Sequence, residues 1–88
     1  MEVQIDQSFI RDVKKAPAHM QKLIPAIIKS LRDAKKITDL PKVKKMAGAK
    51  NAYRIRVDDF RLGFYMDNQL IILSRFLARK EIYKYFPR

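Results

Sequence analysis

Hydrophobic positions recur with two different periods along this chain, and the period changes near the middle. Residues 18–35 carry apolar side chains at spacings of three and four, which form one stripe along a helix. The stripe consists of Met20, Leu23, Ile24, Ile27, Ile28 and Leu31. A shorter stripe predicts a first helix over residues 9–15, which Pro17 ends. Pro25 lies inside the long stripe and predicts a kink or a break there.

From residue 52 onward, the pattern alternates with the period of a β-strand. Residues 52–58 place apolar side chains on one side and arginines on the other. The alternation resumes over residues 60–67, after the turn-forming pair Asp58-Asp59. Residues 69–77 are apolar on both sides, which is typical of a strand inside a sheet. A short first strand is expected over residues 1–5.

These elements predict an α+β fold in a single domain that spans residues 1–88. The expected order is an N-terminal strand, two helices and a three-strand antiparallel meander, with the helices packed on one sheet face. Residues 35–51 are expected to be irregular, because turn signals dominate them. The second sheet face is expected to be free and concave, with the arginines of the meander exposed to solvent.

Charge narrows the range of partners. The 20 lysines and arginines exceed the nine acidic residues by 11, and residues 42–88 carry +8 of that excess. A basic half of a small domain predicts a polyanionic partner, although a basic surface that only aids solubility is the alternative. The chain has no cysteine, one histidine and no spaced carboxylate cluster, so no metal or other cofactor is expected. No apolar run approaches the ~18 residues that span a bilayer, and no membrane association is expected.

Two stretches of the chain resemble a known family. They read YRIRVDDFRLGF and, after a turn, IILSRFLARKEIYKYF. In this order and spacing they resemble the RelE/ParE superfamily of toxins from type II toxin–antitoxin systems, over nearly the whole chain. The arginine-lined strands are more similar to the RelE branch, whose members cleave messenger RNA in the ribosomal A site. The resemblance therefore implies a metal-independent endoribonuclease that inhibits translation.

The resemblance also implies a set of site residues. The positions that match the family's catalytic residues are Arg61 on the third strand, Arg79 on the last strand and Tyr83 in the C-terminal tail. The residues expected to bind RNA phosphates are Arg54, Arg56, Lys44, Lys45 and Lys80. Such enzymes let the RNA 2′-hydroxyl attack the adjacent phosphorus, and arginines suit the resulting charge because their forked donors bind phosphate oxygens. For Tyr83 we favour stacking on a base over proton transfer.

One position departs from the family pattern. Many relatives read H-R-x-E-I-Y here, whereas this chain has Ala78 before Arg79. Alanine cannot transfer the proton that a histidine would. Three explanations stay open: an activity that works without the histidine, a drift to an impaired toxin, or an engineered replacement, which we favour. His19 is expected to be a surface residue without a catalytic role.

The absence of cysteine fits a cytoplasmic protein, and the resemblance implies several partners. They are a cognate antitoxin, the ribosome and its messenger RNA, with operator DNA bound through the antitoxin. Two rival interpretations remain. A non-catalytic RNA-binding or ribosome-binding protein would use the same basic face, and Ala78 favours it. A ParE-like inhibitor of DNA gyrase would share the fold, but protein binding alone does not require the arginine array.

Overall fold

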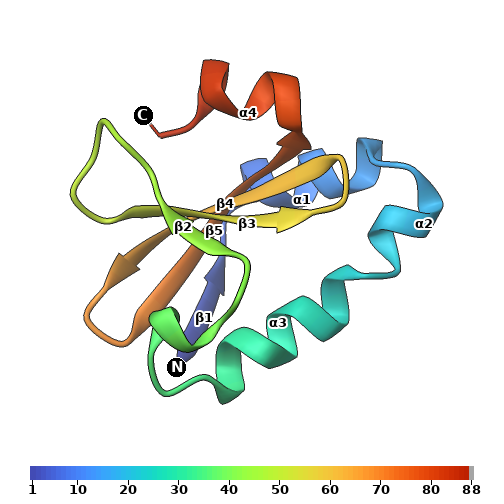
Figure 1. Cartoon of the computed structure of the whole chain (residues 1–88). Coiled ribbons are helices and arrows are strands. Elements are labelled where there is room, and N and C mark those ends of the chain that lie inside the picture. The colour runs from blue at the N-terminus through green and yellow to red at the C-terminus, as the bar shows by residue number, and fades with distance from the viewer. Residues whose placement is uncertain (88) are drawn as a thin grey trace.

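A five-stranded sheet forms the centre of the computed structural model, which describes residues 1–87 (Figure 1). The strands lie in the order β1-β5-β4-β3-β2. Their bounds are β1 (Glu2–Ile5), β2 (Val43–Lys45), β3 (Ala52–Val57), β4 (Phe60–Asp67) and β5 (Leu70–Ala78). β1 pairs with β5 in parallel, and the other pairings are antiparallel. The predicted α+β class, the N-terminal strand and the three-strand meander are therefore confirmed.

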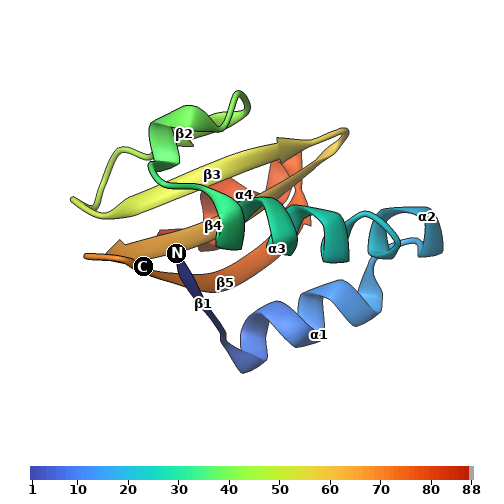
Figure 2. The same ribbon diagram turned by 90° about the horizontal axis from the view of Figure 1, so that it is seen from below.

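Two helices, α1 (Gln7–Lys15) and α3 (Ile24–Asp33), pack against one side of this sheet, and the short helix α2 (Ala18–Gln21) connects them beyond the ends of the strands (Figure 2). The apolar stripes of these helices pack against the apolar side chains that alternate along the strands of the meander. The main core includes Phe9, Met20 and Leu31 from the helices, which lie in one buried cluster with Leu62 and Phe64 of β4. Burying each such side chain stabilises the fold by about 1.5–3 kcal/mol.

The long predicted helix is in fact two helices. The chain turns at Lys22 and Leu23, and α3 starts at Ile24, so that Pro25 lies in its first turn. A proline is tolerated there because the first N–H groups of a helix have no partner within the helix. The break that Pro25 predicts is confirmed, and α2 becomes a short separate element between α1 and α3.

The sheet face opposite these helices is partly covered, which the sequence analysis did not expect. Helix α4 (Arg79–Tyr85) follows β5 directly and packs on that face, so the expectation of a wholly free face was wrong. Ile82 and Phe86 form a second small core with Met46 and Ala52. In Figure 2, α4 lies behind the sheet while α3 lies in front of it, and α1 lies beside β1 and β5.

Gly63 of β4 makes this second core possible. A Cβ atom at this position would lie 2.7–2.8 Å from ring atoms of Phe86, closer than packed side chains approach one another. The missing side chain therefore lets the Phe86 ring rest directly on the backbone of β4. This contact fixes the end of α4 over the middle of the sheet.

Beyond its pairing with β1, the edge of β5 forms hydrogen bonds with helix α1. The parallel pairing ends at Leu73, and the carboxylate of Asp12 then accepts a hydrogen bond of 2.9 Å from the backbone N–H of Phe76. The same carboxylate pairs with Arg75 at 2.7 Å. These bonds satisfy backbone that would otherwise be exposed, and they hold β5 in place up to the start of α4.

Residues 35–51 are less irregular than expected. They contain a short 3₁₀ turn, η1 (Ile37–Asp39), and the edge strand β2, which pairs Lys44 with Arg54 of β3. Within residues 1–87, no helix combines the length and the apolar character needed to cross a bilayer.

Candidate functional site

Cationic side chains form two rows across the sheet face that carries α4. In the first row Lys44 lies opposite Arg54, which in turn lies opposite Gly63. In the second row Arg56 lies opposite Arg61. Because the rows are two residues apart along β3, their spacing is about 7 Å. Strand pairing alone therefore brings basic residues from three strands onto one surface.

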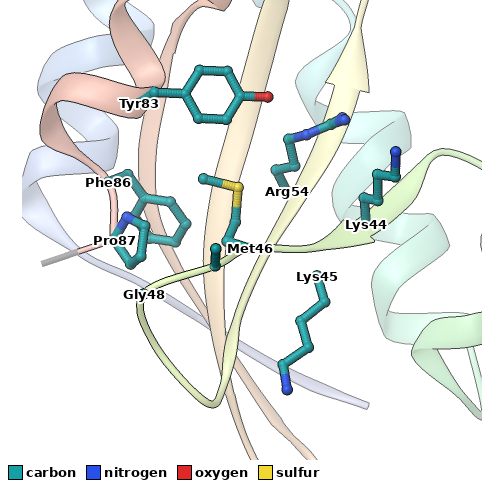
Figure 3. Close-up of a pocket in the computed structure, with 9 residues that line it drawn as sticks. Lys44, Lys45, Met46, Gly48, Arg54, Tyr83, Phe86 and Pro87 are labelled. Atoms are coloured by element: carbon teal, nitrogen blue, oxygen red, sulfur yellow. The ribbon is translucent and has the colours of Figure 1, made fainter.

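The first row borders a cleft of about 500 Å³, which we call the tyrosine cleft. Lys44 and Arg54 line one side and Tyr83 of α4 lines the other, with Met46 and Phe86 forming an apolar floor. Figure 3 shows the hydroxyl end of Tyr83 pointing across the cleft toward Arg54. Tyr83 is 58% exposed, so its side chain is accessible to a ligand in the cleft.

The second row borders a cleft of about 560 Å³, which we call the arginine cleft. Its lining includes Arg56, Arg61, Arg79, Lys42, His19 and the Asp58-Asp59 turn. The backbone N–H of Arg79 donates to the carbonyl of Asp59 at 2.7 Å, and this bond ties the start of α4 to the β3–β4 turn. A smaller hollow of about 300 Å³ shares Lys44 and Arg54 with the tyrosine cleft, and Lys42 and Arg56 with the arginine cleft.

Arg61 is buried, although the sequence analysis expected it to be exposed. Only 7% of the residue is accessible, and its Nη1 donates to the carbonyls of Asp58 and Phe60 at 2.9 Å each. Its Nε has no hydrogen-bond partner among residues 1–87. The guanidinium therefore holds the β3–β4 turn, where Asp58 adopts a positive φ of 52°, and its side chain is fixed before any ligand binds.

The positive charges of three other arginines lie near Arg61. Burial is the main cause that lowers the pKa of its guanidinium, and the positive charge of Arg54 is the next. Arg79 and Arg56 lower this pKa further, while Tyr83 acts in the opposite direction. An arginine stays charged despite such shifts. The face is therefore a region of concentrated positive potential, which favours an anionic ligand.

Comparisons with known proteins agree with this geometry. No family model matches the chain. The chain is 40% identical over 88 residues to Toxin RelE3 of Methanocaldococcus jannaschii, covering 99% of this chain and 100% of that protein. This chain belongs to the RelE family of toxins. It is thus a toxin of the toxin–antitoxin type.

Solved structures support the membership of this toxin in the RelE family. The toxin matches a chain of the RelB–RelE antitoxin–toxin complex from Methanococcus jannaschii with a TM-score of 0.80 and 36% identity, over 96% of the toxin and 99% of that chain. A RelE–RelB complex from Pyrococcus horikoshii gives a TM-score of 0.72 at 17% identity, over 89% and 93%. The YoeB dimer of Staphylococcus aureus gives 0.71 at 18%, over 90% and 97%. The last two show a shared fold only.

The other expected site residues of the RelE-family toxin lie in several places. Lys45 borders the tyrosine cleft, but it lies opposite Tyr53 of β3 and its side chain points away from Tyr83 (Figure 3), so only Lys44 directs its charge to the cationic face. Arg79 is the first residue of α4 and not part of the last strand, which corrects the expectation. Ala78 ends β5 opposite Phe60, and Lys80 is exposed on α4. Within residues 1–87, these last two side chains line neither cleft.

One polar residue of the arginine cleft was not expected there. His19 is exposed, as expected, but it lines the same cleft as Arg56 and Arg79, which are far from it in the sequence. The apolar floor of the tyrosine cleft was also missed. Neither has a local signal: both depend on how α2 and α4 pack against the sheet.

Proposed function

We propose that this RelE-family toxin is a ribosome-dependent endoribonuclease that stops translation by cutting messenger RNA in the cytoplasm. The observation that carries the proposal is the convergence of Arg54, Arg56, Arg61 and Arg79 on one sheet face beside Tyr83. Binding a protein partner does not require four arginines around two clefts, whereas a phosphate that gains charge during a reaction does. This favours RNA cleavage over gyrase inhibition.

The proposed reaction joins the 2′-oxygen to the adjacent phosphorus and breaks the bond from phosphorus to the 5′-oxygen. Arg56 and Arg79 are exposed and would bind the oxygens of that phosphate. Arg61 is buried, so we assign it a positioning role that keeps the turn and the local charge in place. Tyr83 would stack on a base in the tyrosine cleft, beside the phosphate contacts of Lys44 and Arg54.

We also propose a protein antitoxin as the partner that silences this surface. The solved neighbours include RelB–RelE antitoxin–toxin complexes. An acidic segment of such an antitoxin would neutralise the two cationic rows, and this predicts binding that weakens as salt increases. Operator DNA would then be bound through the antitoxin.

The test is cleavage of messenger RNA on programmed ribosomes, with the cut ends mapped, for this chain and its Ala78→His variant in parallel. Cuts within the A-site codon by both proteins support the proposal and show that position 78 is dispensable. Cuts by the variant alone support it and identify Ala78 as a disabled catalytic position. If both bind ribosomes and neither cuts, the protein is a non-catalytic binder.

A further inference from the structure

We infer that His19 is a catalytic residue of the arginine cleft and accepts the proton of the attacking 2′-hydroxyl. The inference rests on the proposed function and adds the group that the arginines cannot supply. Guanidinium groups stay protonated and can only stabilise charge. Imidazole is the side chain that gains and loses a proton near neutral pH, and the chain has a single histidine.

The position of His19 is fixed by its neighbours on both sides. Ala16 precedes the short helix α2 and Met20 lies within it, and because both are buried in the main core they anchor this segment. The side-chain amide of Gln21 donates to the carbonyl of Ala16 at 2.8 Å and closes this turn. His19 therefore projects from a held segment, although its own side chain is exposed.

The groups that surround the imidazole match the needs of a reacting phosphate. Arg56 and Arg79 supply exposed positive charge on the same cleft, and Lys42 and the buried Arg61 add to it. The carboxylates of the Asp58-Asp59 turn also line the cleft. A phosphate bound by the arginines would bring the adjoining ribose to the side of the cleft that α2 forms.

The proposed step balances without any further reagent. The neutral imidazole of His19 takes the 2′-hydroxyl proton while the 2′-oxygen forms its bond to phosphorus. The bond from phosphorus to the 5′-oxygen breaks, and the 5′-oxygen takes a proton from water. The imidazolium then returns its proton to water, leaving a 2′,3′-cyclic phosphate and a 5′-hydroxyl.

The first test measures single-turnover cleavage on ribosomes from about pH 5.5 to 8.5. General-base catalysis contributes about 100- to 10,000-fold, so His19→Gln is expected to slow cleavage at least 100-fold and to remove the loss of rate at acidic pH. Free imidazole is expected to restore part of the rate of His19→Ala. The matched control is Lys22→Gln, at an exposed position that ends α2 and lies outside both clefts.

The second test uses the single histidine as a spectroscopic probe. A short RNA whose attacking 2′-hydroxyl is replaced by hydrogen cannot be cut and is added to the full chain. The imidazole signals of His19 are expected to shift in a saturable way. Signals that stay fixed while the backbone amide of Arg79 shifts would overturn the inference.

The outcomes separate this inference from the proposed function. If the parent chain cuts and His19→Gln cuts at the same rate with the same pH profile, His19 has no catalytic role and the proposed function stands. If neither the parent chain nor Ala78→His cuts, both proposals fall. A slow His19→Gln variant with an unchanged pH profile, and a His19→Ala variant that imidazole does not rescue, would reduce His19 to a structural role.

Discussion

The two clefts on the α4 face are similar in volume, but different parts of the chain build them. The tyrosine cleft depends on the second small core, because Met46 and Phe86 form its floor and Tyr83 comes from the helix that this core anchors. The arginine cleft depends on the β3–β4 turn and on α2, which the main core holds. An apolar floor with an open aromatic ring suits a base, whereas clustered arginines beside an imidazole suit a phosphate and its proton transfer.

This difference has a consequence for stability. Among residues 1–87, the main core contains 13 buried residues and the second contains four. The tyrosine cleft should therefore be lost under milder conditions than the arginine cleft, since local opening follows the amount of apolar burial. Under the proposed function, changes in the first cleft should alter RNA binding, and changes in the second should alter the rate of the chemical step.

Apart from the His19 variants, the largest effect is expected from Arg79→Ala in the arginine cleft. Removing one donor from a site that stabilises reaction charge costs about 2–4 kcal/mol, so the single-turnover rate should fall roughly 30- to 1,000-fold. The melting temperature should not change, because the side chain is exposed. Lys84→Ala is the matched control, since it removes one exposed positive charge from the same helix. If Arg79→Ala and Lys84→Ala reduce the cleavage rate equally, the rate depends only on the net charge of the toxin.

A smaller effect, on stability, is expected from Gly63→Ala. The new methyl group would meet the Phe86 ring at 2.7–2.8 Å, and such overpacking costs about 1–3 kcal/mol of unfolding free energy. Chemical denaturation measures this loss of unfolding free energy. The affinity for RNA should decrease more than the rate of the chemical step, because α4 carries Tyr83. Adding Phe86→Leu should reduce the penalty of Gly63→Ala. If the losses of unfolding free energy from Gly63→Ala and Phe86→Leu are simply additive, the contact with Phe86 is not the reason why a larger residue destabilises position 63.

Comparing the clefts also shows how far the sequence could predict this molecule. The helical stripe and the alternation of the meander are strong periodic signals, so they predicted the main core and the shared face of Arg54, Arg56 and Arg61. Strand β2 was missed because three residues carry too little pattern, and its pairing with β3 defines it. Helix α4 was left open because its anchor, Phe86 on Gly63, is a tertiary contact.

In the candidate site, too, strand alternation was predictable and tertiary contacts were not. Strand alternation put Arg54 and Arg56 on one face, and the register confirms that face. The burial of Arg61 could not be predicted, because it follows from backbone carbonyls that only the folded turn presents. His19 was set aside because the sequence separates it from the arginines, and only the packing of α2 brings them to one cleft.

The third prediction concerns the aromatic ring of the tyrosine cleft. Stacking on a base contributes about 1–3 kcal/mol, so Tyr83→Ala should weaken the binding of short RNA roughly 5- to 150-fold. Tyr83→Phe keeps the ring and should retain most of the affinity and rate. Fluorescence anisotropy measures the affinity, and ribosomal cleavage measures the rate. A Tyr83→Phe variant that binds normally but cuts slowly would assign proton transfer to the hydroxyl and move catalysis into the tyrosine cleft.

The smallest effect is expected from Lys44→Gln at the rim of the tyrosine cleft. Lysine contacts with phosphate release counterions, so the slope of log affinity against log salt should decrease by about 0.7 for single-stranded RNA, with little change at high salt. Lys29→Gln is the control, because Lys29 lies on α3 on the other side of the sheet and pairs with Asp33 at 2.6 Å. An equal change in slope for both variants would mean that RNA responds to the overall charge of the toxin. A change for Lys44 alone would mean that a phosphate contacts the first cationic row beside the tyrosine cleft.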